Sequence, residues 1–375
     1  MNRRERLMAT LNGKPVDRPA VSFYELEGYF SNPGNPDPYN VYSDPSWKPL
    51  LDMAWEKTDL MCFTHPLFKN APPCASPFKT RNWEEGDSRF SETTVTVGGR
   101  TLRSLARRDK DIATTWTLKH LCADADDLRA FLELPETTDW GEPDVSAALA
   151  MEAEIGDAGI LLLNTSDPIG HLAPLLEMGE FTIVALTEPE LCHRALERFS
   201  REILGRVSAF AQALPGRLWR ICGPEYVSEP YLPPEFFEQY VTRYDKPLVE
   251  AIQKHGGFAR IHSHGRLRNV LAHIAATGCD GLDPIEPPRQ GDVSLAEVRR
   301  AHGKQMALFG NLESTDIENL PTKDFIPLVD RALREGTEGE GRGFVLMPSA
   351  CPYGRKLPPL AMKNYEAMLD RVERL

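Results

Sequence analysis

Three features are missing from this sequence: long hydrophobic runs, paired cysteines and an excess of positive charge. No stretch of about 18 apolar residues occurs, and Met1–Leu7 contains no apolar run followed by a small-residue cleavage site. The seven cysteines are an odd number, lie far apart and include no CxxC pair, so they do not form a disulfide framework. We therefore expect a cytoplasmic protein that neither spans a membrane nor is secreted.

The formal net charge of −12 argues against nucleic acid as a partner, because neutralising phosphates requires clustered Lys and Arg. A length of 375 residues with 41% hydrophobic content suits either one large α/β barrel or two ordinary domains. Neither a linker nor a fixed-period repeat divides the chain, so we expect a single domain over residues 1–375. The sequence leaves the oligomeric state open, with a homodimer as one option.

Short apolar segments alternate with segments of helical periodicity, such as Arg3–Leu11 near the start. Eight such strand candidates, each followed by a helical segment, predict a (β/α)8 TIM barrel. An open doubly wound sheet is disfavoured because no GxGxxG or GxxxxGK[ST] turn follows a strand. The strand candidates are Pro19–Tyr24, Asp59–Thr64, Gly159–Asn164, Leu218–Cys222, Phe258–His262, Gly281–Asp283, Met306–Gly310 and Gly343–Met347.

The region after the second strand has a different pattern. Ser91–Leu105 contains two runs of alternating residues around Gly98-Gly99, which predicts a β-hairpin. Trp116–Lys119 is a candidate for a further strand of it. We expect an antiparallel β insertion over about residues 85–120.

Chemistry in such a barrel lies at the carboxyl ends of the strands, and the segment His262-Ser-His264 follows the fifth strand. Residues i and i+2 of an extended segment point the same way, so both imidazoles can face one point. Two His with a carboxylate or thiolate and one open position describe a catalytic metal site. Glu225 and Cys351, which follow the fourth and eighth strands, would face the same mouth.

Each candidate also has a simpler reading. A His at a strand end often bonds only backbone or solvent, and Cys is commonly an inert buried residue. Asp283 and Glu286 could cap a helix, although the next helix should begin near Leu295 with Ser294 as its cap. The remaining polar residues at strand ends are candidates for substrate binding or for fixing loops: Asn164, Asn311 and Glu313.

Three motifs carry a resemblance to a known family. They are Arg3–Leu7 leading to Gly13–Pro19, Gly278–Asp283, and Gly310-Asn311. Together they resemble the uroporphyrinogen decarboxylase-like superfamily over nearly the full length of the chain. True decarboxylases of that superfamily carry an arginine-rich RQAGRY-type loop after the first strand. This chain has Glu25 and Glu27 there, which would repel a polycarboxylate, so the resemblance does not imply that reaction.

The resemblance is stronger to the corrinoid methyltransferase branch, whose zinc is held by a His-x-Cys pair after the fifth strand and a Cys near the eighth. His262 and Cys351 match the first and last of these ligands, His264 stands where the branch has Cys, and Glu225 would add a carboxylate. The implied cofactors are zinc and a corrinoid carried by a partner protein.

The implied activity is methyl transfer between a small substrate and that corrinoid. Tyr24, Asp283 or Glu286 would orient the substrate or pass a proton to the leaving oxygen. A second hypothesis is a lyase or decarboxylase for a small acid, with an arginine as the carboxylate anchor. A third is a non-catalytic barrel that binds a ligand. The candidate anchors of the second hypothesis are Arg220, Arg260 and Arg355.

Overall fold

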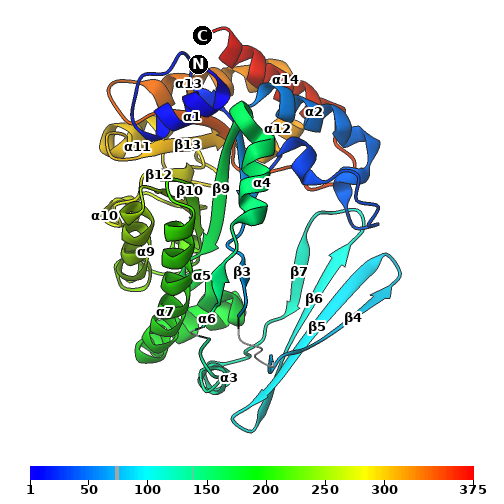
Figure 1. The fold of residues 1–375 in the computed structure, drawn as a ribbon, viewed down its shortest axis with the longest axis vertical. Coiled ribbons are helices and arrows are strands. Elements are labelled where there is room, and N and C mark those ends of the chain that lie inside the picture. The colour runs from blue at the N-terminus through cyan, green and yellow to red at the C-terminus, as the bar shows by residue number, and fades with distance from the viewer. Residues whose placement is uncertain (72–75, 138) are drawn as a thin grey trace.

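The computed structural model describes residues 1–71, 76–137 and 139–375. Its body is an α/β fold with a curled eight-stranded parallel sheet in the order β1-β14-β13-β12-β11-β10-β9-β2, with helices around it (Figure 1). All eight expected strand segments form strands of this sheet. Their bounds are β1 Ala20–Val21, β2 Leu60–Thr64, β9 Gly159–Ser166, β10 Leu218–Cys222, β11 Phe258–Ser263, β12 Gly281–Pro284, β13 Ala307–Leu312 and β14 Phe344–Pro348.

Helices connect the strands, and several begin where the sequence predicts. The helix α1 covers Arg3–Leu11, and Asn2 and Glu5 form a capping box at its N-terminus. The helix α11 begins at Leu295, and Ser294 and Glu297 form a second capping box there. The others are α2 Lys48–Lys57, α3 Ala125–Phe131, α4 Ser146–Ile155, α5 Pro168–Leu172, α6 Met178–Thr187, α7 Pro189–Ala213, α8 Glu235–Phe237, α9 Arg243–Lys254, α10 Leu271–Ala276, α11 to His302, α12 Ser314–Asn319, α13 Thr322–Thr337 and α14 Pro359–Glu373.

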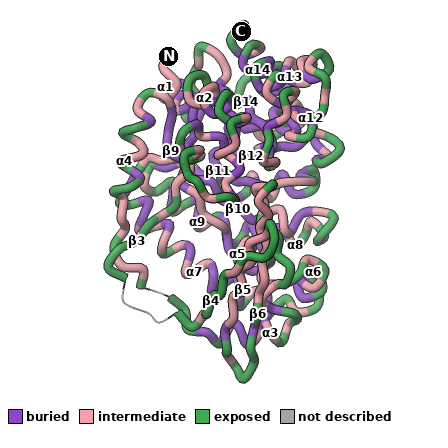
Figure 2. Tube along the Cα trace, turned by 90° about the vertical axis from the view of Figure 1, so that its right-hand side faces the viewer, coloured by how far each residue is buried: buried purple, intermediate pink, exposed green. Residues whose placement is uncertain are grey.

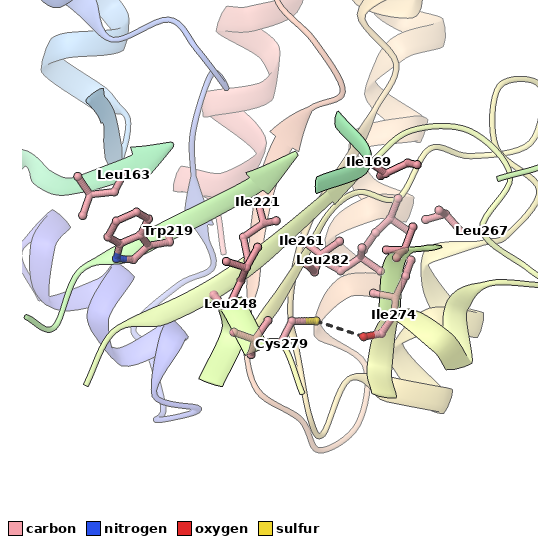
Figure 3. Packing of buried hydrophobic residues seen from close by; sticks show 14 of the residues in the cluster. Leu163, Ile169, Trp219, Ile221, Leu248, Ile261, Leu267, Ile274, Cys279 and Leu282 are labelled. Atoms are coloured by element: carbon pink, nitrogen blue, oxygen red, sulfur yellow. Dashed lines mark hydrogen bonds between the residues drawn. The ribbon is translucent and has the colours of Figure 1, made fainter. Parts of the chain in front are cut away.

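Side chains of the parallel strands alternate between the inside of the curled sheet and the helix layer. The inner set includes Met61, Leu162 and Phe309, all buried. The outer set, with Leu163, Trp219 and Ile261 among it, belongs to one core cluster with Leu248 of α9 and Ile274 of α10 (Figure 3). The strands of the curled sheet are therefore largely buried, whereas those of the antiparallel insertion are mostly intermediate or exposed (Figure 2). The period of two determines which side chains of the curled sheet face inward.

The insertion after β2 is a separate antiparallel sheet that projects from the body (Figure 1). Gly98 and Gly99 turn the expected hairpin with positive φ of 56° and 72°, which glycine adopts without steric cost. One strand of this sheet was not predicted, because Lys79–Glu85 lacks the alternation of apolar residues that is typical of a strand. The sheet comprises β4 Lys79–Glu85, β5 Ser88–Val97, β6 Arg100–Asp109 and β7 Thr115–Lys119, and a small pair joins β3 Phe68–Lys69 to β8 Glu142–Pro143.

Within the described residues, no single helix is long and apolar enough to cross a membrane. One bent helix pair, Pro168–Leu175 with Met178–Thr187, meets the requirement by length and composition only.

Asp59 joins the two edge strands of the curled sheet. Its N–H donates to the Val21 carbonyl at 2.7 Å, and its carboxylate accepts the Val21 N–H at 2.9 Å. Arg6 of α1 and Arg18 donate to the two oxygens of the same carboxylate, which is fully buried. One side chain thus connects the first helix and both edges of the sheet.

We expect Asp59→Ala to lower the free energy of unfolding by about 3–5 kcal/mol, because it leaves the buried Val21 N–H without an acceptor and removes the charge that Arg6 and Arg18 share. Urea unfolding followed by circular dichroism measures the loss. Asp52→Ala is the control, since Asp52 contacts only the exposed side chains of Lys48 and Tyr29 among the described residues, and its loss should cost less than about 1 kcal/mol. Equal losses in the two variants would contradict this account.

Candidate functional site

The carboxyl ends of β9 to β12 bring four polar side chains to the inner face of the sheet. Asn164 lies in register with Arg220, and His262 with Asp283. These positions continue the alternation that places Leu162 and Leu218 inside, so the pattern of the strands orients them. The inner face therefore changes from apolar to polar near the mouth.

A fully buried ion pair underlies His262. Asp283 contacts Nε of Arg260 at 2.9 Å and Nδ1 of His262 at 2.8 Å, and neither Arg260 nor Asp283 is exposed. Burial alone would raise the pKa of Asp283, but the charge of Arg260 and the hydrogen bond from His262 outweigh it and bring the pKa to about 2. Because this carboxylate can only accept, Nδ1 of His262 donates, and the lone pair of the neutral ring lies on Nε2.

His264 is held in the same manner by Glu286. Its Nδ1 lies 2.9 Å from Oε1 of Glu286, whose Oε2 accepts the N–H of Gly265 at 2.7 Å. Burial raises the pKa of Glu286, but the hydrogen bond from His264 outweighs it, and the net pKa is lowered. The rings of His262 and His264 lie 4.6 Å apart at 89° to each other. Asp283 and Glu286, predicted as catalytic groups, here position the two imidazoles.

Arg220 connects Tyr24 to the inner polar groups. Its Nη1 donates to the Tyr24 hydroxyl at 2.8 Å and to Glu25 at 2.9 Å, and its Nε donates to Oδ1 of Asn164 at 2.8 Å. The Tyr24 hydroxyl is 3.5 Å from Nε2 of His262. Burial raises the pKa of Tyr24 well above its usual value, so the hydroxyl keeps its proton. Arg220 and Arg260 occupy inward-facing positions of their strands. The alternation of the sequence indicates those positions, and so their place in this network.

The other two predicted metal ligands are less closely tied to the imidazoles. The sulfur of Cys351 lies 3.9 Å from the Phe23 carbonyl oxygen, and burial raises the pKa of its thiol well above the usual range. Oε2 of Glu225 is buried and has no hydrogen-bond partner in the described part of the chain. Over those same residues, no three His, Cys, Asp or Glu side chains gather as a metal site requires. The ligand set of Glu225, His262, His264 and Cys351 stays a prediction.

The predicted substrate-binding residues line two different cavities. Asn164 lines one of about 150 Å³ beside β9, whereas Asn311 and Glu313 line one of about 400 Å³ between β13 and α13. Glu313 is 3% exposed, and its Oε1 has no partner among the described residues. Burial, and secondarily the charge of Glu286, raise the pKa of Glu313 to about 7. Their separation has no signal in the sequence, because the two cavities depend on how the outer helices pack.

The fold and site place the protein among α/β proteins built on a curled parallel sheet with polar groups at the carboxyl ends of its strands. The family model of uroporphyrinogen decarboxylase (URO-D) matches residues 147–375, so the chain belongs to the URO-D family. This confirms the resemblance expected from the motifs.

Among solved structures, a methyltransferase from Methanosarcina mazei is similar, with 18% identity, a TM-score of 0.61 and coverage of 99% of each chain. That similarity supports the fold. A D-psicose 3-epimerase from Clostridium cellulolyticum H10 has 9% identity and a TM-score of 0.36, covering 61% of this chain and 82% of that one, and supports no conclusion. A search of curated protein sequences gives no significant match.

Glu313 gives a pH-dependent test of the 400 Å³ cavity. Its folded-state pKa of about 7 lies above the ordinary 4.5, so the folded protein loses stability as the pH rises between these values. We expect Glu313→Gln to raise the free energy of unfolding by about 1–2 kcal/mol near pH 8, and to have little effect near pH 4.

Denaturant unfolding at both pH values measures this difference. Glu340→Gln removes the same charge from a side chain that is 93% exposed, and should change nothing at either pH. If Glu313→Gln changed the free energy of unfolding equally at both pH values, ionisation of the Glu313 carboxyl would not be what destabilises the folded protein.

Proposed function

We propose that this chain is a zinc-dependent methyltransferase that moves a methyl group between a small substrate, such as a methyl ether, and a corrinoid carried by a partner protein. The observation that carries the proposal is the imidazole pair of His262 and His264, with both Nδ1 atoms bonded to buried carboxylates. Protein histidines that bind metal through Nε2 are commonly held in this way. In this proposal the curled sheet is a closed (β/α)8 barrel with its chemistry at the mouth.

The donor set suits a zinc ion in three respects. Nε2 of His262 is left as a lone-pair donor by the bond from Nδ1 to Asp283. A buried carboxylate oxygen without a partner, such as Oε2 of Glu225, is a group that a cation would satisfy. Cys351 would supply a thiolate, which zinc accepts readily once the thiol is deprotonated. Glu225 and Cys351 would complete the site by joining the two imidazoles.

His264 bears on the direction of the reaction. It replaces the Cys of the methyltransferase pattern, and a neutral imidazole in place of a thiolate leaves the bound metal a stronger Lewis acid. Such a metal supplies polarisation of an ether or alcohol oxygen, which favours demethylation of the substrate. The Tyr24 hydroxyl keeps its proton, is fixed by Arg220 and lies 3.5 Å from Nε2 of His262, so it is placed to donate to the leaving oxygen.

The alternative is a lyase or decarboxylase that acts on a small acid. The buried Arg220 favours it as a carboxylate anchor, because its partner Glu25 is 44% exposed and a substrate carboxylate can displace it. Arg260 is already neutralised by Asp283. Arg355 donates to the carbonyl of Lys110, next to the antiparallel insertion, so it fixes a loop. Metal content separates the two functions, because the alternative does not need zinc.

We expect protein purified without a chelator or a histidine tag to contain about one zinc per chain, by elemental analysis. His262→Ala should lose the metal, because it removes the ring whose Nε2 is left as a lone-pair donor by the bond from Nδ1 to Asp283. His302→Ala, at the end of α11, is the matched control and should keep the metal. Metal-free wild-type protein, together with unchanged stability in His262→Ala, would refute the zinc site and leave the alternative.

We further expect Tyr24→Phe to lower kcat for demethylation of a methyl ether by about 100-fold or more, with zinc content and KM nearly unchanged. An anaerobic assay with reduced cobalamin as acceptor measures the rate. Tyr29→Phe, whose hydroxyl contacts only the surface residue Asp52, should keep the wild-type rate. Full activity in Tyr24→Phe would exclude its hydroxyl as the proton donor.

A further inference from the structure

The cavity of about 150 Å³ beside the carboxyl end of β9 has a basic lining. Its polar members carry N–H or O–H groups, and the described lining includes no carboxylate. This contrasts with a chain whose formal net charge is −12. The residues with polar side chains are His65, Asn164, Thr165, Ser166, His171 and Arg206.

Arg206 of α7 has a partly buried guanidinium without a counter-ion among the described residues. It makes no hydrogen bond or ion pair with them, and its Nε is fully buried. The guanidinium carbon lies 5.1 Å from the Trp140 ring centre and 5.8 Å from that of Phe68, so aromatic rings hold it in place. Glu202, one turn earlier, is paired with Arg198 at 3.6 Å.

Other groups in the cavity add hydrogen-bond donors. The oxygen of Asn164 is occupied by Arg220, which leaves its amide N–H groups to donate. His171 makes no hydrogen bond with the described residues, and its ring lies 5.5 Å from that of Phe199. Burial, and then the charge of Arg206, lower the pKa of His171, so this ring is neutral and offers one N–H.

We propose that this cavity binds an oxyanion, the carboxylate or phosphate group of a small molecule. An unpaired guanidinium in a partly buried site is costly, and a planar oxyanion is the group that matches its fork of N–H donors. A volume of about 150 Å³ accommodates one such group. It excludes a whole corrinoid.

The cavity adjoins the proposed active site through Asn164. This residue lines the cavity and also bonds Arg220, which in turn holds the Tyr24 hydroxyl. A substrate with its anionic end at Arg206 would extend toward the inner polar groups. This last step rests on the proposed function, whereas anion binding itself does not.

Isothermal titration of the full chain with inorganic phosphate and, separately, with acetate tests the proposal. We expect at least one of the two anions to bind. The anion that binds more tightly shows whether the cavity prefers a phosphate or a carboxylate group. Arg206→Met should weaken that binding by at least about 10-fold, because a charge-assisted hydrogen bond is lost. Arg194→Met removes the same charge from an exposed position on the same helix and should bind as the wild type does.

Two further variants keep the result interpretable. His171→Phe preserves an aromatic ring beside Phe199 and should also weaken binding, which guards against a folding defect peculiar to Arg206→Met. His262→Ala should retain anion binding even if it loses metal, so failure of the zinc proposal and failure of this one are distinguishable. Binding of neither anion to the wild type, or equal binding by wild type and Arg206→Met, would overturn the proposal.

Discussion

The ion pair of Arg260 and Asp283 is the interaction on which the polar interior depends. Both side chains are fully buried inside the curled sheet, where neither charge could remain without the other. The pair also fixes one nitrogen of His262, so the ring has a defined orientation and tautomer. Arg220 then extends the network to Tyr24, and every link lies on a rigid strand or directly after one.

This arrangement separates the carboxylates that hold the imidazoles from the groups that are open to a ligand. Asp283 and Glu286 hold the two imidazoles from behind, which leaves the opposite ring nitrogens and the Tyr24 hydroxyl as the groups that can meet a ligand. A carboxylate whose pKa is held near 2 does not deliver protons near neutral pH, whereas a tyrosine that keeps its proton can. In the proposed function, Asp283 and Glu286 are therefore positioning residues and Tyr24 is the proton donor.

The eight parallel strands were predictable because each is a short apolar run. The helix α1 was predictable from the helical spacing of its apolar residues, and α11 from the capping residue Ser294. The strand Lys79–Glu85 was not, since its polar sequence pairs only through its neighbour β5. The imidazole pair followed from a spacing of two along one strand. The separation of Asn164 from Asn311 and Glu313 could not be foreseen, because it depends on side chains of α7 and α13 that are remote in sequence.

Charge balance connects the inner network with the proposed metal. Arg260 is neutralised by Asp283 and Arg220 by Glu25, whereas Glu286 leaves one negative charge beside a neutral His264. A dication held by the two imidazoles would need at least one further negative group, since an uncompensated charge in a poorly solvated interior is costly. In the proposed site, Glu225 and a thiolate of Cys351 are the sources of that charge. The exchange of a thiolate for the imidazole of His264 removes one negative charge from the ligand set, and Glu225 and Glu286 are the carboxylates that would replace it.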